Sequence, residues 1–336
     1  MWHLLEADSA NELWIRAVEA LRGDSGIHIQ PSRAGDTREI LHAALTLRNP
    51  RNRWVTMRRP AMNPAFALAE VFWILGGRRD AKFLTYFNRS LHQHSGNAAC
   101  LHGAYGYRLR HHFKFDQLER AFEALRNNPN SRQVVLQIWD AKADLPLADG
   151  VPRDSDIPCN TQAILKVRDG KLEWLQVMRS NDIFLGLPHN LVQFTFLQEV
   201  LAGWLQIDVG QYHHVSDSLH LYERDQVSIE PATAQLDSAT DNFSLPKSDS
   251  DAAIAGIVSA VEFMIDEDNT AGQVAELIPK AMLPVAYRNL LCVLVAEALR
   301  RRQAFKEADA AIGHCSNPTF SHMWVNWSER LGNHTK

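Results

Sequence analysis

A predicted strand gives way to a predicted long helix within the stretch Met178-Arg179-Ser180-Asn181-Asp182-Ile183-Phe184-Leu185-Gly186-Leu187-Pro188-His189-Asn190. Apolar residues recur at helical spacing over residues 187–204, so Pro188 and Asn190 fall in the first helical turn. Arg179 lies on the strand that feeds this turn. A strand end facing a helix start can hold a phosphate with arginine donors and backbone N–H groups. The alternative for Arg179 alone is a surface salt bridge.

A second informative stretch precedes the first and runs Asp156-Ile157-Pro158-Cys159-Asn160-Thr161-Gln162. It leads into two apolar runs, residues 163–168 and 171–177, which are joined by Asp169-Gly170. An Asp-Gly pair accepts the positive φ angles of a type I′ turn, so the pattern predicts a hairpin. Cys159 then lies directly before a strand. Nearby arginines would lower the pKa of its thiol and favour the nucleophilic thiolate, whereas the alternative is a buried structural thiol.

The rest of the chain is organised in two parts. Helical spacing at residues 11–22, 63–75 and 116–127 alternates with strand patterns such as residues 133–139, which we expect to form a buried strand. These patterns predict an α+β fold. A Ser- and Asp-rich segment with Pro246 precedes alanine-rich helical patterns at residues 251–264, 272–281 and 287–304. We therefore expect a catalytic domain over residues 1–235 and a helical C-terminal extension over residues 236–336.

Composition sets wide bounds on function. The chain has 336 residues, of which 46% are hydrophobic, and a net charge of -4, so nothing in its overall charge favours binding to DNA or to a membrane. It contains no apolar run of about 18 residues and no basic, then apolar, N-terminal leader, so we expect a cytoplasmic protein. Four widely spaced cysteines without a C-x-x-C pair predict reduced thiols and no metal site.

Three further side chains are suited to a nucleotide. The carboxamide of Asn190 offers one acceptor and two donors and can match the N–H and carbonyl edge of uracil, whereas an aspartate would suit cytosine better. His220 and Tyr222 alternate in a predicted strand and share a face, which suits two hydrogen bonds to a sugar hydroxyl. The alternatives are a polar residue in a first helical turn for Asn190 and a core or rim position for the other two.

The chain resembles the thymidylate synthase superfamily through ordered blocks between residues 30 and 230. These blocks are Glu70-Val71-Phe72-Trp73-Ile74-Leu75-Gly76-Gly77, His102-Gly103-Ala104-Tyr105-Gly106-Tyr107, Asn130-Ser131-Arg132-Gln133, Pro158-Cys159, Arg179-Ser180-Asn181-Asp182, Gly186-Leu187-Pro188-His189-Asn190 and His220-Leu221-Tyr222. The resemblance implies a large mixed sheet with surrounding helices and a homodimer whose phosphate sites are shared across the interface. It makes Arg132 the phosphate arginine lent to the partner, Arg179 the local one and Arg33 that of a mobile loop.

The resemblance also implies a mechanism. Cys159 would add to carbon 6 of the pyrimidine, and carbon 5 would then attack the one-carbon unit of 5,10-methylenetetrahydrofolate. Glu70 resembles the family's catalytic glutamate, which organises water and moves protons, with Tyr105 and Asp182 in supporting positions. The alternative for Glu70 is a carboxylate on a helix surface.

Departures from the methylating members bear on the product. Residues 88–100 contain His92 and His94 but no tryptophan to exclude water, and Asn160 stands where those members have a histidine after the nucleophile. The apolar C-terminal tail of the family is also missing. These features look more like the pyrimidine nucleotide hydroxymethylases. Together with Asn190 and Ser180, a form associated with deoxyribose, they predict hydroxymethylation of deoxyuridylate.

Two alternatives stay open at this point. One is thymidylate synthase activity, with a methyl product and dihydrofolate. The other is a non-catalytic nucleotide-binding or scaffold protein, because Gln133 replaces the family's second borrowed arginine and the C-terminal helices are appended. Arg300, Arg301 and Arg302 end an apolar helix, where we expect a solvated basic helix end rather than a contact with folate.

Overall fold

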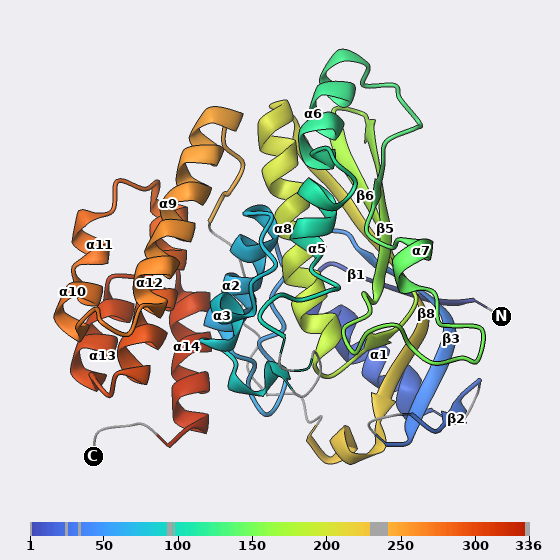
Figure 1. The fold of residues 1–336 in the computed structure, drawn as a ribbon, viewed down its shortest axis with the longest axis horizontal. Helices are drawn as coiled ribbons and strands as arrows, with labels where there is room; N and C mark the ends of the chain where they lie inside the picture. The colour runs from blue at the N-terminus through green and yellow to red at the C-terminus, as the bar shows by residue number, and fades with distance from the viewer. Residues whose placement is uncertain are drawn as a thin grey trace.

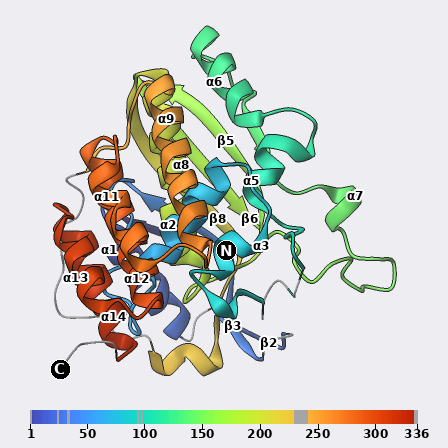
Figure 2. The ribbon, with the colours of Figure 1, turned by 60° about the vertical axis from the view of Figure 1, so that its left-hand side comes forward.

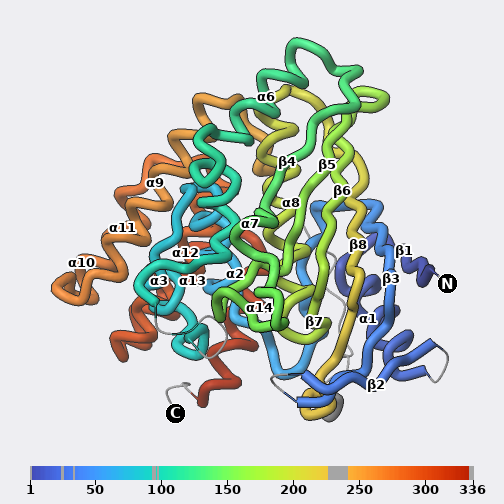
Figure 3. The backbone as a smooth tube through the Cα atoms, turned by 45° about the vertical axis from the view of Figure 1, so that its right-hand side comes forward, coloured from blue at the N-terminus to red at the C-terminus, as the bar shows by residue number. Residues whose placement is uncertain are grey.

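The computed structural model describes residues 2–23, 26–32, 35–92, 96, 98–228 and 241–332. Within these residues the strands form one mixed sheet in the order β1-β3-β8-β6-β5-β4, with β2 paired to β3 and β7 to β8 (Figure 3). The strands are β1 (His3–Ala7), β2 (His28–Gln30), β3 (Thr37–Leu47), β4 (Val135–Gln137), β5 (Asn160–Arg168), β6 (Lys171–Met178), β7 (Asn181–Asp182) and β8 (Asp208–Tyr222).

Helices cover the sheet and extend away from it on one side (Figure 1). The α-helices of the described residues are α1 (Ala10–Arg22), α2 (Pro64–Leu75), α3 (Ala81–Thr85), α5 (Tyr105–Tyr107), α6 (Gln117–Asn127), α7 (Ala141–Asp144), α8 (Gly186–Leu205), α9 (Lys247–Ile265), α10 (Ala271–Ala275), α11 (Leu277–Lys280), α12 (Val285–Arg301), α13 (Phe305–Gly313) and α14 (Pro318–Arg330). This arrangement confirms the α+β fold with a mixed sheet. None of the described helices combines the length and apolar character that a membrane span requires.

The hairpin and the long helix form where the sequence predicts them. β5 and β6 pair antiparallel, and Asp169 and Gly170 between them adopt positive φ angles of 50° and 71°. α8 contains the predicted residues 187–204 and is buried almost all round, because it packs on β6 and β8 on one side and on α2 on the other. The sequence therefore places the start of α8 beside the sheet end that carries Cys159.

Two expectations about local structure are wrong. β4 is an edge strand rather than a buried one: it ends the sheet, and Val135 is 45% exposed while Leu136 is buried. Residues 272–281 do not form one helix but divide into α10 and α11. Pro279 lacks an N–H and cannot donate to the carbonyl of Ala275, so a continuous helix would lose that bond.

The C-terminal helices pack directly on the sheet-covering helices (Figure 2). α9 contacts both α2 and α8, and α12 and α14 contact α2. Their apolar side chains belong to the same continuous buried cluster as those of α2 and α8. Gly203 of α8 permits close approach, because a Cβ there would lie 2.5 Å from the backbone nitrogen of Leu245. The boundary predicted near residue 235 lies outside the described residues and stays a prediction.

A buried carboxylate joins α8 to two other segments. Glu199 is fully buried; Arg51 donates to it at 2.8 Å, and the buried Arg53 also pairs with it. The backbone N–H of Phe243 donates to the same carboxylate at 3.1 Å. Glu199 thereby connects the helix to the loop after β3 and to the chain that enters α9.

We expect Glu199→Gln to lower the free energy of unfolding by about 3–5 kcal/mol, because it leaves the Arg53 guanidinium buried without its counter-charge. Urea unfolding measures the change. The control is Glu12→Gln, which removes an exposed pair with Arg16 and should cost less than about 0.5 kcal/mol. Equal losses in the two variants would contradict this account of the core.

Candidate active site

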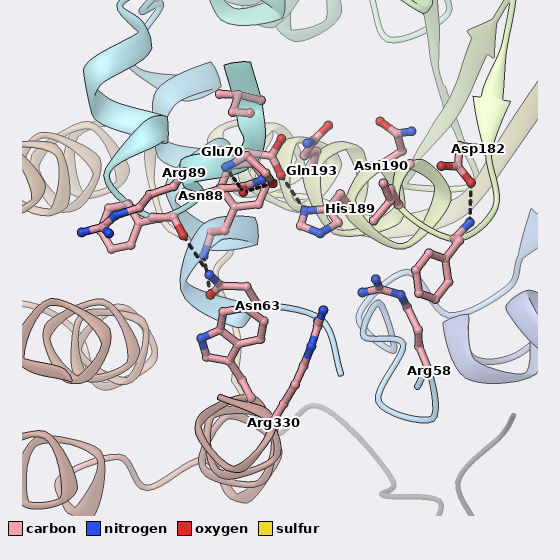
Figure 4. Close-up of a pocket in the computed structure, with 18 of the residues that line it drawn as sticks. Arg58, Asn63, Glu70, Asn88, Arg89, Asp182, His189, Asn190, Gln193 and Arg330 are labelled. Atoms are coloured by element: carbon pink, nitrogen blue, oxygen red, sulfur yellow. Dashed lines mark hydrogen bonds and ion pairs between the residues drawn. The ribbon is translucent and has the colours of Figure 1, made fainter. Parts of the chain in front are cut away.

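A cavity of about 1030 Å³ opens where α2, the start of α8 and the end of β8 meet the C-terminal helices. Figure 4 shows its polar lining, with Glu70, His189 and Asn190 on one side and Arg58 and Arg330 on the other. The cavity joins residues that are far apart in the sequence. Its lining includes eight of the predicted site residues: Glu70, Tyr105, Cys159, Ser180, Asp182, Asn190, His220 and Tyr222.

The three arginines predicted to bind phosphate differ in their position relative to the cavity. Arg179 lies at the thiol of Cys159, although its side chain is not part of the cavity lining. Arg132 is exposed on the chain before β4 and is also absent from that lining. Its predicted role in a partner's site stays a prediction. Arg33 lies outside the described residues.

Arg179 fixes the backbone around Cys159. Its N–H donates to the carbonyl of Cys159 at 2.9 Å, and its guanidinium donates to the carbonyls of Pro158 and Ile157 at 3.0 and 3.1 Å. One guanidinium nitrogen lies 3.8 Å from the thiol sulfur. Burial raises the pKa of the Cys159 thiol, whereas the charge of Arg179 lowers it. The arginine therefore opposes the cost of forming a thiolate in this half-buried position.

Glu70 pairs with a histidine that the sequence analysis gave no role. Nδ1 of His189 lies 2.6 Å from a carboxylate oxygen of Glu70, as the dashed line in Figure 4 marks. The imidazole also packs on Phe66, with ring centroids 5.2 Å apart. The available signal was its position directly before Asn190, where a titratable ring stands in the first turn of a largely apolar helix.

Asp182, His220 and Tyr222 gather at the end of the sheet. The short strand β7 pairs with β8 so that Asp182 lies opposite His220. The backbone N–H of Phe184 donates to Asp182 at 2.7 Å. Burial raises the pKa of the Asp182 carboxyl, while the N–H of Phe184 and the charge of His220 lower it. His220 and Tyr222 pack edge to face and both line the cavity, as their shared strand face predicts.

Tyr105 is held in its neutral form. Its pKa is raised by burial and by the neighbouring Cys159, so its hydroxyl keeps its proton across the physiological range. A neutral phenol in this lining can donate a hydrogen bond to a ligand.

Two arginines of the cavity wall escaped the sequence analysis. Arg58 is 3% exposed, and its guanidinium lies over the ring of Phe184 at 4.1 Å. Among the described residues neither Arg58 nor Arg330 forms an ion pair, and the buried Nε of Arg58 has no hydrogen-bond partner. Burial and the charge of Arg330 lower the pKa of Arg58 to about 10. This wall is therefore suited to an anionic group of a ligand.

The expectation of a solvated basic helix end is wrong for Arg300 and Arg301. Their side chains are 11% and 14% exposed and pair with the fully buried Glu297 at 2.7 and 3.0 Å. Trp327 of α14 donates to the same carboxylate at 3.2 Å. Both arginines and Trp327 line the cavity. The C-terminal helices thus form part of its wall, which local sequence patterns did not indicate.

The tryptophan-free stretch also reaches the cavity. Asn88, Arg89, Ser90 and Leu91 line it, and His92 is exposed beside them, with Nδ1 2.6 Å from the carbonyl oxygen of Arg89. His94 lies outside the described residues. The indole in the cavity lining comes instead from Trp327.

Comparison with known proteins agrees with this constellation. A model of the family described as thymidylate synthase matches residues 26–258. The chain is 32% identical over 281 residues to the deoxyuridylate hydroxymethyltransferase of Pseudomonas phage M6, covering 80% of this chain and 77% of that protein. It is 36% identical over 197 residues to the protein of the same name from Bacillus phage SP01, covering 55% of this chain and 50% of that protein. It is also 32% identical over 144 residues to the thymidylate synthase of Clostridium beijerinckii, covering 43% of this chain and 50% of that enzyme.

We expect Arg179→Gln to slow alkylation of Cys159 by iodoacetamide, because the thiolate loses its neighbouring cation. The loss should be about tenfold for each unit by which the pKa of the thiol rises. Because burial already raises that pKa, the rate in the unchanged protein should increase with pH through the alkaline range. Peptide mass spectrometry after timed labelling measures the rates.

The exposed Cys100 serves as the control within each sample, since its reactivity should not depend on Arg179. Arg179→Lys keeps a positive charge and should keep most of the reactivity of Cys159. Identical rates for Cys159 in the glutamine variant and the unchanged protein would contradict the electrostatic role.

Proposed function

Because this chain belongs to the thymidylate synthase family, we propose that it transfers a one-carbon unit to carbon 5 of deoxyuridylate and releases the 5-hydroxymethyl product. The family consists of enzymes that act on a pyrimidine nucleotide with a folate co-substrate, which fits a cavity lined by a thiol, a carboxylate and several arginines. The relatives named as deoxyuridylate hydroxymethyltransferases support the finer assignment.

In this proposal Cys159 is the nucleophile. Its thiolate adds to carbon 6 of the uracil ring, and the electron pair of the carbon 5–carbon 6 double bond moves to the carbon 4 carbonyl, so that carbon 5 becomes nucleophilic. 5,10-Methylenetetrahydrofolate supplies the one-carbon unit when it is bound. Asn190 orients the ring, and Tyr105 donates a hydrogen bond near the reacting atoms. His220 and Tyr222 bind the sugar hydroxyl. Asp182 supports the side of the pocket where the folate binds.

The pairing of His189 with Glu70 is the observation that carries the choice of product. After carbon 5 has bonded to the one-carbon unit, carbon 5 loses its proton and tetrahydrofolate leaves, so that carbon 5 bears an exocyclic methylene. Either a hydride or a water molecule then completes the reaction. Nδ1 of His189 is held by Glu70, so Nε2 is left to accept a proton from water, and the carboxylate stabilises the imidazolium that results. Water then adds to the methylene, and the Cys159 sulfur leaves as carbon 6 regains its double bond.

The charged wall suits the anionic parts of the two substrates. We propose that Arg58 and Arg330 face a carboxylate of the folate, because these guanidinium groups have no ion-pair partner among the described residues. The Arg330 guanidinium also lies over the ring of Trp327, which shares the lining. Arg179 and Ser180 are assigned to the nucleotide phosphate. Arg132, exposed and apart from this cavity, is proposed to serve the phosphate site of the second subunit of a homodimer.

Thymidylate synthase activity is the second candidate. Trp327 favours it, because its indole lines the cavity and an aromatic ring there helps to exclude water. Against it stands the His189–Glu70 pair, which places titratable polar atoms in the same cavity.

The product identifies the activity. With deoxyuridylate and 5,10-methylenetetrahydrofolate we expect a 5-hydroxymethyl nucleotide in mass spectrometry and no rise in absorbance from dihydrofolate. Cys159→Ala should abolish turnover while it keeps nucleotide binding, because it removes only the sulfur that forms the adduct. Thymidylate with an equal amount of dihydrofolate would reverse the assignment, and normal turnover by Cys159→Ala would exclude the covalent mechanism.

We expect His189→Phe to shift the product toward thymidylate. The substitution keeps an aromatic ring against Phe66 but removes the nitrogen that accepts a proton from water. The ratio of the hydroxymethyl product to thymidylate should fall by about a hundredfold or more, because a general base typically contributes about 10²–10⁴-fold to the rate of its step. The ratio of the two nucleotide products measures it. An unchanged ratio at reduced overall rate would show that His189 does not direct water.

A further inference from the structure

Behind Asn190, buried polar side chains lead from the cavity into the sheet. Nδ2 of Asn190 donates to Oδ1 of Asn181 at 3.1 Å. Nδ2 of Asn181 lies 3.1 Å from Nε2 of His214 and 3.2 Å from the hydroxyl oxygen of Ser216. Nδ1 of His214 in turn lies 3.0 Å from the hydroxyl of Tyr212. We call Asn181, His214, Ser216 and Tyr212 the buried relay.

Of the four relay residues, Asn181 alone reaches the cavity lining, and the relay carries no net charge. His214, Ser216 and Tyr212 are fully buried, and Asn181 is 2% exposed. Burial lowers the pKa of His214 to about 3 and raises that of Tyr212, so both side chains are neutral at physiological pH. A neutral imidazole has a single N–H, and that proton must be on either Nδ1 or Nε2.

The neighbours of His214 decide where the proton lies. Nε2 faces an N–H of Asn181, so it must accept, and the hydroxyl of Ser216 at 2.9 Å can also donate to it. The proton is then on Nδ1 and is donated to the oxygen of Tyr212. Hydrogen bonds run in one direction: Asn190 donates to Asn181, Asn181 to His214 and His214 to Tyr212.

This direction determines what Asn190 offers to a base. One N–H of the Asn190 amide is donated to Asn181. The second N–H and the carbonyl oxygen Oδ1 of Asn190 remain available to a ligand in the cavity. One donor beside one acceptor matches the carbon 4 carbonyl and the N3–H of uracil. Rotating only the Asn190 amide would set its oxygen against the oxygen of Asn181. Cytosine, with an acceptor at N3 and a donor at carbon 4, needs that rotated amide.

The reverse direction would read the other base. If His214 carried its proton on Nε2, it would donate to the oxygen of a rotated Asn181. Asn181 would then donate to the oxygen of a rotated Asn190, which would present its N–H groups where Oδ1 now lies. The same side chains in the same positions would then match cytosine.

We propose that the buried relay is a specificity device, in which Asn181 and His214 are positioning residues that hold the Asn190 amide in its uracil-reading orientation. His214 acts through its Nδ1–H tautomer and never contacts the nucleotide. The proposal rests on the proposed function in one respect, because it takes Asn190 as the side chain that reads the base.

The first test compares deoxyuridylate with deoxycytidylate in three forms of the full chain. Asn181→Leu removes the acceptor for Asn190 at similar volume, so the uracil preference in kcat/KM and in nucleotide affinity should fall by about tenfold or more. Asn181→Asp is the matched control: its carboxylate still accepts from Asn190, and His214 can move its proton to Nε2 and donate to the same carboxylate, so the preference should be kept. An unchanged preference in Asn181→Leu overturns the proposal.

The second test uses only the unchanged protein, so it does not depend on whether a variant folds. The ¹⁵N chemical shifts of His214 in the unchanged protein, assigned through bonds, should show a protonated Nδ1 and an unprotonated Nε2 with no change between pH 6 and 8. A protonated Nε2 overturns the proposed direction.

The two proposals fail in different ways. If the unchanged protein binds deoxyuridylate selectively and Asn181→Leu loses that selectivity without any turnover in either form, the relay stands and the proposed reaction fails. If the unchanged protein prefers deoxycytidylate, the base assignment fails and the relay proposal fails with it. If uracil selectivity and turnover survive in Asn181→Leu, only the relay proposal fails.

Discussion

The site depends on the hydrogen bonds that Arg179 donates to the chain directly before β5. One residue satisfies three successive carbonyl groups, those of Ile157, Pro158 and Cys159, and its guanidinium still lies beside the sulfur. The same contacts that fix the backbone thus bring a positive charge to the thiol, and among the described residues Arg179 is the cation that lowers the pKa of this thiol. Position and electrostatics are linked here, because both come from one residue, Arg179, directly after β6.

The cavity is completed from the other end of the chain. Glu297 is fully buried and accepts from Arg300, Arg301 and Trp327, so it gives the two guanidinium groups in the wall their counter-charge. α12 and α14 contact α2, the helix that carries Glu70, so their packing also bears on the position of the Glu70 carboxylate. The C-terminal helices are therefore part of the site and not merely appended to it, within the residues that the structure describes.

The sequence predicts what depends on local pattern. Asp169-Gly170 fixes the hairpin, helical spacing fixes α8, and together they bring Cys159 and Arg179 to one place. It does not predict what depends on tertiary contacts. Arg58 lies outside any helix or strand, and Arg330 lies far along the chain. Nothing in the local sequence therefore indicates that the two side chains share one wall of the cavity. The edge position of β4 depends in the same way on which strands pair, which a short apolar run does not specify.

The central claim is that water, and not a hydride, completes the reaction on the Cys159 adduct. The most direct measurement is turnover of deoxyuridylate in ¹⁸O-labelled water, followed by mass spectrometry of the nucleotide. The account predicts a 5-hydroxymethyl product that carries the heavy oxygen in its new hydroxyl group. Unlabelled thymidylate formed together with dihydrofolate would contradict it.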